Sequence, residues 1–403
     1  IVPYNTSELA QTHGGVVVKS QYLRPVKEWT RTDEADAVVF TGKFTVPFSW
    51  LNRQAIARVD EASGAYEVIV NGKKVGYTSN AFAPAEFDVT KASQEDMNTI
   101  QIRLLKNHWS RRLESFILSD EPRVGEVYVM SQPIVRVRDV VHNTRVELSQ
   151  KHANVDIGFV VKTESLNPKK ARIHYEILAP DTTVVTYGHQ DIVLDMKRED
   201  TIKIMTQIPY ELTWCADMPV RYRLNLKTQI EGRYVEYQTH LLGFRDVKHD
   251  ENGDFYINGI KTDLNYSNFD VHKITDKDVL GARLLGYNAV RFPASAVPHN
   301  VYRMCDSLGM YVLAQVPIST RNSGISRRLN GNESNNPEWT DSFILRAENS
   351  YFATRNYACV LGYLLAGESS NGINLYESYL RLKALEPKRP IIYIDAQGEW
   401  NSD

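Results

Sequence analysis

Cysteine, long apolar runs and an excess of charge of either sign are scarce or missing in this sequence. Its 403 residues include three cysteines, Cys215, Cys305 and Cys359, which are too few and too scattered for a disulfide scaffold or a thiolate metal site. No apolar run approaches the roughly 20 residues of a membrane-spanning helix, so we expect no membrane partner. Lys and Arg number 47 and Asp and Glu number 49, and this net charge of −2 argues against a nucleic-acid partner.

Motifs that bind cofactors or activate nucleophiles are also missing. Gly-x-Ser-x-Gly does not occur, and no Gly-rich loop follows a predicted strand in a phosphate-binding context. His272 and His299 have no second histidine or carboxylate at ligand spacing, so we expect neither a metal nor a cofactor. Trp109, Trp339 and Trp400 can stack on sugar faces, although core packing or chance exposure is the simpler explanation for each.

The first residue is Ile1 rather than Met, for which a removed export signal and a chosen chain boundary are both explanations. We expect the exported alternative, with a periplasmic or secreted location. A length of 403 residues predicts two to three domains at about 150 residues each.

The first 250 residues have the pattern of β-strands. Short runs rich in Val, Ile, Tyr and Thr, such as 36–46, 65–70 and 100–105, are separated by turn signals. Asn71-Gly72 lies between two such runs and predicts a tight hairpin, since both residues tolerate a positive φ. Regular short strands of this kind indicate a sandwich or a barrel.

A seam near Gln132-Pro133 separates a second all-β block, which ends at about Asp246. Its roughly 110 residues and its strand spacing are typical of an immunoglobulin-like sandwich. We expect its strands at 155–163, 171–178, 201–207 and 221–229.

After residues 255–259 short apolar strands alternate with helical stretches, which favours a parallel sheet or barrel. The expected strands are 261–266, 288–292, 311–316, 360–366 and 390–394, and the expected helices are 275–285, 299–308, 341–356 and 375–385. A closed barrel needs about 250 residues, whereas about 150 remain. We therefore expect a partial barrel of about five strands, with unpaired outer edges and an uncovered apolar interior. Either the rest of the barrel was lost or cut off, or a second chain or a further copy of this chain covers the opening, or the barrel closes in an unusual way.

Five segments in this order resemble glycoside hydrolase family 2, which holds β-galactosidases, β-glucuronidases and β-mannosidases. They are Tyr66–Gly76 with Ala83–Thr90, Phe244-Arg245 with Phe255–Lys261, Asn288–Arg291, Tyr302–Val312, and Arg355-Asn356 with Gly362–Ser369. The resemblance covers essentially the whole chain and implies a multidomain β plus α/β fold. Its parts are a jelly-roll sugar-binding sandwich (1–132), an immunoglobulin-like sandwich (133–246) and a partial TIM-type barrel (247–403). It also implies hydrolysis of O-glycosyl bonds and a carbohydrate partner.

Glu368 is the main candidate catalytic residue. It follows the apolar run 360–366, and the carboxyl ends of barrel strands form the catalytic face. A carboxyl group held against apolar walls retains its proton, which suits a general acid that protonates a glycosidic oxygen. The alternative is a carboxylate that complements the dipole of the next helix. The resemblance implies that Glu368 occupies the acid/base position of the family.

Other polar residues are weaker candidates for substrate binding. Arg291 resembles an arginine that supports the catalytic carboxylates of the family, and a structural ion pair is its alternative role. Asp263, Asn265 and Tyr266 are expected at the end of the first strand, where they can contact sugar hydroxyls or cap the strand. Asn332-Glu333-Ser334 spells the Asn-Glu motif of the family more literally than the segment at Glu368. We attribute it to chance in a polar loop, because no apolar strand precedes it.

The sequence departs from the family in four places. Gly367 stands where an Asn hydrogen-bonds the 2-hydroxyl of the sugar, Gln315 replaces a Glu, and a His is replaced near Ala294. The nucleophile belongs to the seventh strand of the family's barrel, beyond the five expected here. Retaining hydrolysis needs two carboxyl groups about 5–5.5 Å apart, and Asp395 is the alternative second carboxylate.

Two hypotheses remain open. The chain is a fragment or a divergent member of a family 2 β-glycosidase that lacks the nucleophile, or it is a non-catalytic carbohydrate-binding or assembly module descended from one. In both cases we expect these 403 residues to hydrolyse no simple aryl β-glycoside. The sequence does not distinguish galactoside, glucuronide and mannoside.

Overall fold

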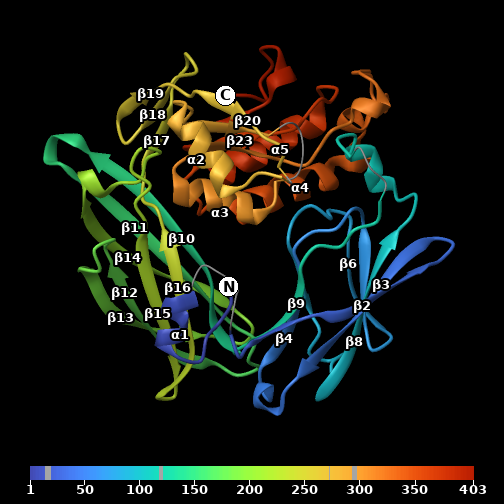
Figure 1. Cartoon of the computed structure of the whole chain (residues 1–403), viewed down its shortest axis with the longest axis vertical. Helices are drawn as coiled ribbons and strands as arrows, with labels where there is room; N and C mark the ends of the chain where they lie inside the picture. Colours follow the sequence, from blue (N-terminus) through green and yellow to red (C-terminus); the bar gives the residue numbers. More distant parts are fainter. Residues whose placement is uncertain (14–19, 118–120, 272, 293–296) are drawn as a thin grey trace.

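The computed structural model describes residues 1–13, 20–117, 121–271, 273–292 and 297–403. Figure 1 shows two β-sandwiches side by side, in blue and in green, with an α/β part in yellow to red above both. The predicted fold class is confirmed: a jelly-roll sandwich, an immunoglobulin-like sandwich and a partial barrel follow one another along the chain.

The jelly-roll sandwich consists of a five-stranded and a four-stranded antiparallel sheet. The first contains, in spatial order, β2 (Lys27–Asp33), β3 (Ala37–Val46), β8 (Asp96–Leu105), β5 (Tyr66–Val70) and β6 (Lys73–Thr78). The second contains β1 (Leu23–Pro25), β9 (Val127–Gln132), β4 (Gln54–Val59) and β7 (Ala85–Asp88). The hairpin predicted at Asn71-Gly72 joins β5 to β6, with φ of 47° and 78° at the two residues.

The immunoglobulin-like sandwich pairs a three-stranded with a four-stranded antiparallel sheet. The smaller sheet contains β10 (Val135–Glu147), β11 (His152–Thr163) and β14 (Glu199–Pro209). The larger one contains β13 (Val184–Leu194), β12 (Lys169–Leu178), β15 (Tyr222–Ile230) and β16 (Arg233–Leu242). Inward-facing apolar residues of both sheets form one core. A short helix, α1 (Ser7–His13), packs on β15 and β16.

The α/β part begins with a small antiparallel sheet of β17 (Val247–His249), β18 (Phe255–Ile257) and β19 (Ile260–Thr262). A five-stranded parallel sheet follows, as predicted: β20 (Tyr266–Asn268), β21 (Ala289–Arg291), β22 (Tyr311–Gln315), β23 (Val360–Leu364) and β24 (Ile391–Ile392). Its helices are α2 (Asp276–Leu284), α3 (His299–Leu308), α4 (Thr340–Thr354) and α5 (Ile373–Leu385). None of the helices in the described ranges is long and apolar enough to cross a membrane.

The boundary of the first parallel strand differs from the prediction. The expected strand 261–266 divides into β19, which pairs antiparallel with β18, and the beginning of β20. The apolar pattern of this stretch does not reveal that the pairing partner changes at residues 263–265, because pairing depends on segments distant in sequence.

The outer edge and the faces of the sheet also differ from the expectation. Ile391 N–H donates to Asp403 Oδ2 at 2.8 Å, Asp403 N–H donates to the Ile391 carbonyl at 2.9 Å, and Tyr393 N–H donates to Ser402 Oγ at 3.0 Å. The expectation of an unpaired edge is therefore wrong for β24. In addition, every residue of β23 is buried, so this strand presents no uncovered apolar face.

Candidate functional site

The carboxyl ends of the parallel strands gather the polar residues that the sequence singles out. Arg291 ends β21, Glu368 follows β23, and Asp395 lies beyond β24 in a short 3₁₀ turn, Ile394–Ala396. A second 3₁₀ turn, Arg321–Ser323, follows β22 and brings Arg321 to the same edge. Since all five strands are parallel, these residues lie at the edge that carries the active site in TIM barrels.

The carboxylate of Glu368 lies in an environment different from the one expected. Its side chain is 67% exposed, and Glu368 Oε2 forms an ion pair with Arg321 Nη1 at 3.0 Å. The expected apolar walls are therefore absent around this carboxylate. An exposed carboxylate beside a guanidinium presents an acceptor and a donor next to each other, which is a suitable arrangement for binding hydroxyl groups.

The backbone around Glu368, in contrast, is fixed by the segment that follows β22. Ser319 Oγ donates to the Glu368 carbonyl at 2.8 Å, and Gly367 N–H donates to the Ile318 carbonyl at 2.8 Å. Thr320 N–H donates to Ser369 Oγ at 3.1 Å. These contacts hold the Glu368 backbone in place while its side chain remains in solvent.

The jelly-roll domain reaches this site through residues 113–115. Ser319 N–H donates to the Leu113 carbonyl at 2.7 Å, and Ser115 N–H donates to the Ser319 carbonyl at 3.1 Å. Residues 113–115 therefore pair through their backbone with Ser319, the residue that supports the Glu368 backbone. A domain distant in sequence contributes to the geometry of the barrel face.

A buried ion pair lies under this junction. Arg346 of α4 contacts Glu114 Oε1 at 2.6 Å, and the two side chains are at most 1% exposed. Arg346 also donates to the carbonyls of Pro317 and Ser79, at 2.8 and 3.0 Å. Burial raises the pKa of Glu114, and the charge of Arg346 opposes that shift. The pair fastens α4 and the segment after β22 to the jelly roll.

Three predicted substrate-binding residues, Asp263, Asn265 and Tyr266, lie away from the carboxyl edge of the sheet. Because β20 begins at Tyr266, Asp263 and Asn265 precede the strand instead of ending it, and the expected position is wrong for both. Asn265 Nδ2 donates to the Gly286 carbonyl at 3.1 Å, and Asn288 Nδ2 donates to the Asp263 carbonyl at 2.8 Å. Tyr266 is the first residue of its strand, so its expected position at the strand end is wrong as well, and all three lie toward the amino end of the sheet.

Arg291 and Gly367 do lie at the carboxyl ends of their strands. Arg291 is exposed, and its charge opposes the rise that burial produces in the pKa of Tyr266. Gly367 offers its backbone N–H to Ile318 and has no side chain to contact a sugar. A role of these residues in substrate binding stays a prediction.

Glu333 is buried, in the 3₁₀ turn Glu333–Asn335, and its match to the family motif by chance stays a prediction. Glu333 is 1% exposed, and Arg112 Nε of the jelly roll contacts its Oε1. Asn374 Nδ2 donates to the Glu333 carbonyl at 2.8 Å. The Trp109 and Trp339 rings meet edge to face beside it, with centroids 5.3 Å apart. This segment is a packed contact between two domains. Its Asn332 Oδ1 accepts from Thr320 Oγ1 at 3.0 Å, and Thr320 N–H donates to Ser369 Oγ at 3.1 Å, so the segment is linked to the residue that follows Glu368.

Two further departures from the family, Gln315 and Ala294, and two further candidates, Asp395 and His272, remain to be placed. Gln315 is buried, and its Nε2 donates to the Val316 carbonyl at 2.9 Å. The side chain of Asp395 is exposed. Ala294 and His272 lie outside the described residues. Within the part of the chain that the structure describes, there is no group of three or more His, Cys, Asp or Glu residues able to hold a metal ion.

Sequence reasoning missed Arg321, Ser319 and the Glu114–Arg346 pair. Arg321 lies in a polar stretch without periodicity, and Glu114 and Arg346 are 232 positions apart. The one signal in the sequence is Arg346, an arginine within a helical pattern. If such an arginine is buried it needs a partner, because an unpaired charge is rarely buried.

Comparison with known proteins gives three family matches in the same order as the three structural parts. Residues 2–143 match the sugar binding domain of glycosyl hydrolases family 2, residues 135–245 match glycosyl hydrolases family 2, and residues 253–402 match the family's TIM barrel domain. Together these matches cover nearly the whole chain.

Curated relatives include two β-galactosidases. The one from Psychromonas ingrahamii is 25% identical over 376 residues, covering 88% of this chain and 35% of the relative. The one from Yersinia enterocolitica is 26% identical over 416 residues, covering 95% of this chain and 38% of the relative. The chain thus spans less than two fifths of the length of these relatives.

Solved structures share the fold. Bacteroides uniformis β-glucuronidase 2 superimposes with a TM-score of 0.74 at 18% identity, over 89% of this chain and 46% of that one. Parabacteroides merdae β-glucuronidase gives a TM-score of 0.73 at 15% identity, over 90% and 50% of the two chains. With three family matches in order and this shared fold, the chain belongs to glycosyl hydrolases family 2.

Proposed function

We propose that the protein is a β-glycosidase that acts on O-glycosyl bonds, with Glu368 in the acid/base position. We further propose that residues 1–403 alone bind a β-glycoside without hydrolysing it. The observation that carries the proposal is the placement of Glu368. Its backbone is fixed at the carboxyl end of β23 by Ser319, which the jelly-roll segment 113–115 holds in turn.

The chemistry available to Glu368 is incomplete. Its carboxyl group can deliver a proton to a leaving oxygen, whereas a retaining reaction also needs a carboxylate to attack the anomeric carbon. The described contact of the Glu368 carboxylate is with a cation, the Arg321 guanidinium, and we propose that the nucleophile comes from outside the five strands. Galactosides and glucuronides are the first substrates to test, because relatives and structural neighbours carry these names.

A non-catalytic carbohydrate-binding or assembly module is the second candidate. Two observations favour it: Gly367 lacks the side chain that contacts the 2-hydroxyl in the family, and the Glu368 carboxylate lacks apolar walls. The glycosidase and a carbohydrate-binding module both include sugar binding at the barrel face, whereas an assembly module does not. The exported location and a covering partner chain stay predictions.

Titration with methyl β-galactoside and methyl β-glucuronide, followed by calorimetry or saturation-transfer NMR, tests binding at this face. We expect Glu368→Gln and Arg321→Gln each to weaken it about tenfold, because each removes a charged hydrogen-bonding group. Arg327→Gln is the matched control, since Arg327 pairs with Glu399 at 3.0 Å and both are about half exposed. Binding that is unaffected by either site variant would contradict the proposal.

A further inference from the structure

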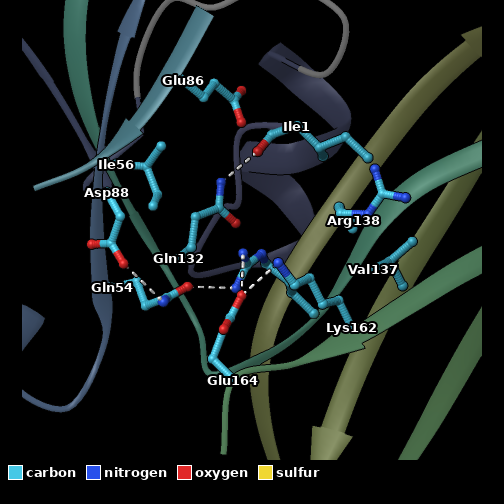
Figure 2. Close-up of a pocket in the computed structure, with 11 residues that line it drawn as sticks. Ile1, Gln54, Ile56, Glu86, Asp88, Gln132, Val137, Arg138, Lys162 and Glu164 are labelled. Carbon is cyan, nitrogen blue, oxygen red and sulfur yellow. Dashed lines mark hydrogen bonds and ion pairs between the residues drawn. The ribbon is translucent and has the colours of Figure 1, made fainter. Parts of the chain in front are cut away.

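A cavity of about 320 Å³ lies between the jelly roll and the immunoglobulin-like sandwich, remote from the barrel face. One wall is formed by β4 and β7 of the jelly roll, with Gln54, Ile56, Glu86 and Asp88. The opposite wall is formed by β10, β11 and Glu164 after β11. Ile1 and Gln132 also line the cavity, and Gln132 Nε2 donates to the Ile1 carbonyl at 2.8 Å. Figure 2 shows the side chains of both walls around it. Its volume lies at the lower end of the range for small-molecule sites.

The jelly-roll wall presents acceptors. In β7, Phe87 is buried, and the alternation of a strand directs Glu86 and Asp88 to the other side, toward the cavity. The Glu86 side chain is 46% exposed, and its nearest cation is Arg58 Nη1 at 3.5 Å. Asp88 Oδ1 accepts from Thr90 N–H at 2.9 Å, and Asp88 Oδ2 accepts from Gln54 Nε2 at 3.5 Å. Both carboxylates therefore retain the capacity to accept further hydrogen bonds.

The opposite wall presents donors. Arg136 lines it although the residue is only 8% exposed, and Lys162 lies directly opposite Arg136 in the register of β10 and β11. Arg138 follows on the same wall and forms a bidentate pair with Glu199, at 2.9 and 3.1 Å. A buried guanidinium that lines a cavity is a donor with a fixed direction.

A continuous set of polar contacts joins the two walls. Arg136 Nη1 donates to Gln54 Oε1 at 2.8 Å, and Arg136 Nη2 lies 3.7 Å from Glu164 Oε1. Lys162 Nζ contacts the same Glu164 oxygen at 2.7 Å. Figure 2 shows these contacts running from Asp88 through Gln54 to Glu164 and Lys162. The cavity therefore has fixed polar walls contributed by two domains.

The charges of the lining indicate a neutral ligand. Three acidic side chains (Glu86, Asp88, Glu164) and three basic side chains (Arg136, Arg138, Lys162) line the cavity, so the charges of its side chains cancel. A free anion would meet the carboxylates of one wall, and a free cation would meet the guanidinium groups of the other. Hydroxyl groups both donate and accept, so a polyhydroxylated molecule satisfies both walls at once.

We propose that this cavity binds a neutral sugar of one or two rings, whose hydroxyls donate to Glu86 and Asp88 and accept from Arg136. The site is separate from the Glu368 face and does not depend on the proposed glycosidase function. Because both domains contribute, an occupied site also bridges the jelly roll and the immunoglobulin-like sandwich.

Saturation-transfer NMR and calorimetry of the 403-residue chain with D-galactose, D-glucose and D-mannose test the proposal. We expect Glu86→Gln to weaken binding of at least one sugar about tenfold, since it replaces a charged acceptor. Glu34→Gln is the matched control and should change nothing. Its side chain is also 46% exposed and faces a single arginine, Arg103, at 3.3 Å. Hydrogen exchange should slow at residues 54–56 and 134–137 when the sugar is bound.

Variants at the barrel face separate this proposal from the proposed function. Sugar binding that survives Glu368→Gln and Arg321→Gln but weakens in Glu86→Gln supports the cavity site. Binding that weakens only in the barrel-face variants overturns the cavity site and leaves the proposed function standing. Absence of binding of all three sugars, or binding of glycine or inorganic phosphate in their place, also overturns it.

Discussion

The jelly roll contacts two other domains, the barrel through a closed seam and the immunoglobulin-like sandwich through an open seam. The two interfaces are built in opposite ways. Its seam with the barrel is closed by the fully buried Glu114–Arg346 pair and by backbone hydrogen bonds to Ser319. Its seam with the immunoglobulin-like sandwich encloses a polar cavity whose acidic wall is partly exposed. A closed seam fixes geometry, and an open polar seam offers a place for a ligand. The first seam therefore positions Glu368, whereas the second is the candidate for additional binding.

Breaking the closed seam should have the largest effect. Arg346→Met leaves Glu114 buried without its cation, and removing one partner of a buried pair costs about 3–5 kcal/mol. Urea unfolding followed by tryptophan fluorescence measures the loss. Arg381→Met is the control, because its pair with Glu348 is partly exposed and should contribute less than about 1 kcal/mol. Equal losses of unfolding free energy in the two variants would show that the buried Glu114–Arg346 pair contributes no more to stability than the partly exposed Arg381–Glu348 pair.

The pH dependence of stability tests the same seam at His299. Burial lowers the pKa of His299 to about 4, assisted by the positive charge of Arg58 across the seam. The unfolded chain takes up a proton at His299 below about pH 6.5, while the folded chain does not until about pH 4, so stability rises with pH between these values. The contribution is about 3 kcal/mol, from about 2.5 pKa units at 1.36 kcal/mol each.

His299→Gln should remove this part of the slope. The relevant quantity is the free energy of unfolding of the parent minus that of the variant, measured from pH 4 to pH 7. This difference cancels opposing groups such as Asp306, whose pKa burial raises to about 6. A difference that stays constant over this range would contradict a partly buried His299 that stays neutral in the folded chain down to about pH 4.

A smaller loss is expected where the closed seam meets the barrel loop. Arg112→Met removes the cation that contacts the buried Glu333 carboxylate, which should cost about 1–3 kcal/mol. Arg321→Met is the matched control, because its partner Glu368 is exposed, and it should change stability by less than about 0.5 kcal/mol. If Arg321→Met were the more destabilising of the two variants in urea unfolding, the roles assigned to Glu333 and Glu368 would be wrong.

The smallest effect on stability should come from the open seam. Glu86→Gln alters a partly exposed carboxylate 3.5 Å from Arg58, so we expect a change within about 0.5 kcal/mol. The same variant should weaken sugar binding about tenfold. A destabilisation above about 2 kcal/mol would show that the open seam depends on its charges for folding, as the closed seam does.

Locally encoded features of the fold could be predicted from the sequence. Asn71-Gly72 marks its hairpin because both residues accept positive φ, and these values are observed. The expected helix 275–285 corresponds to α2, which Thr275 caps, and the helix at 299–308 has the expected bounds. Composition, turns and periodicity therefore identified the three parts of the chain.

The surroundings of the candidate site could not be predicted in the same way. Glu368 was found because it follows an apolar strand, yet its partner Arg321 lies in a loop without a pattern. Glu333 was attributed to chance because no apolar strand precedes it, and its burial could not be predicted because its partner Arg112 belongs to another domain, more than 200 positions earlier. Asp263 and Asn265 were misplaced because the local pattern does not tell an antiparallel strand from a parallel one. In each case the deciding contact joins residues distant in sequence.

The most direct test of the central claim is the release of nitrophenol from nitrophenyl β-galactoside and nitrophenyl β-glucuronide by residues 1–403. Because we propose that the nucleophile comes from outside the five strands, we predict no turnover above that of Glu368→Gln. Turnover by the parent chain that disappears in Glu368→Gln would contradict the account, because it would require a second catalytic carboxylate within these residues.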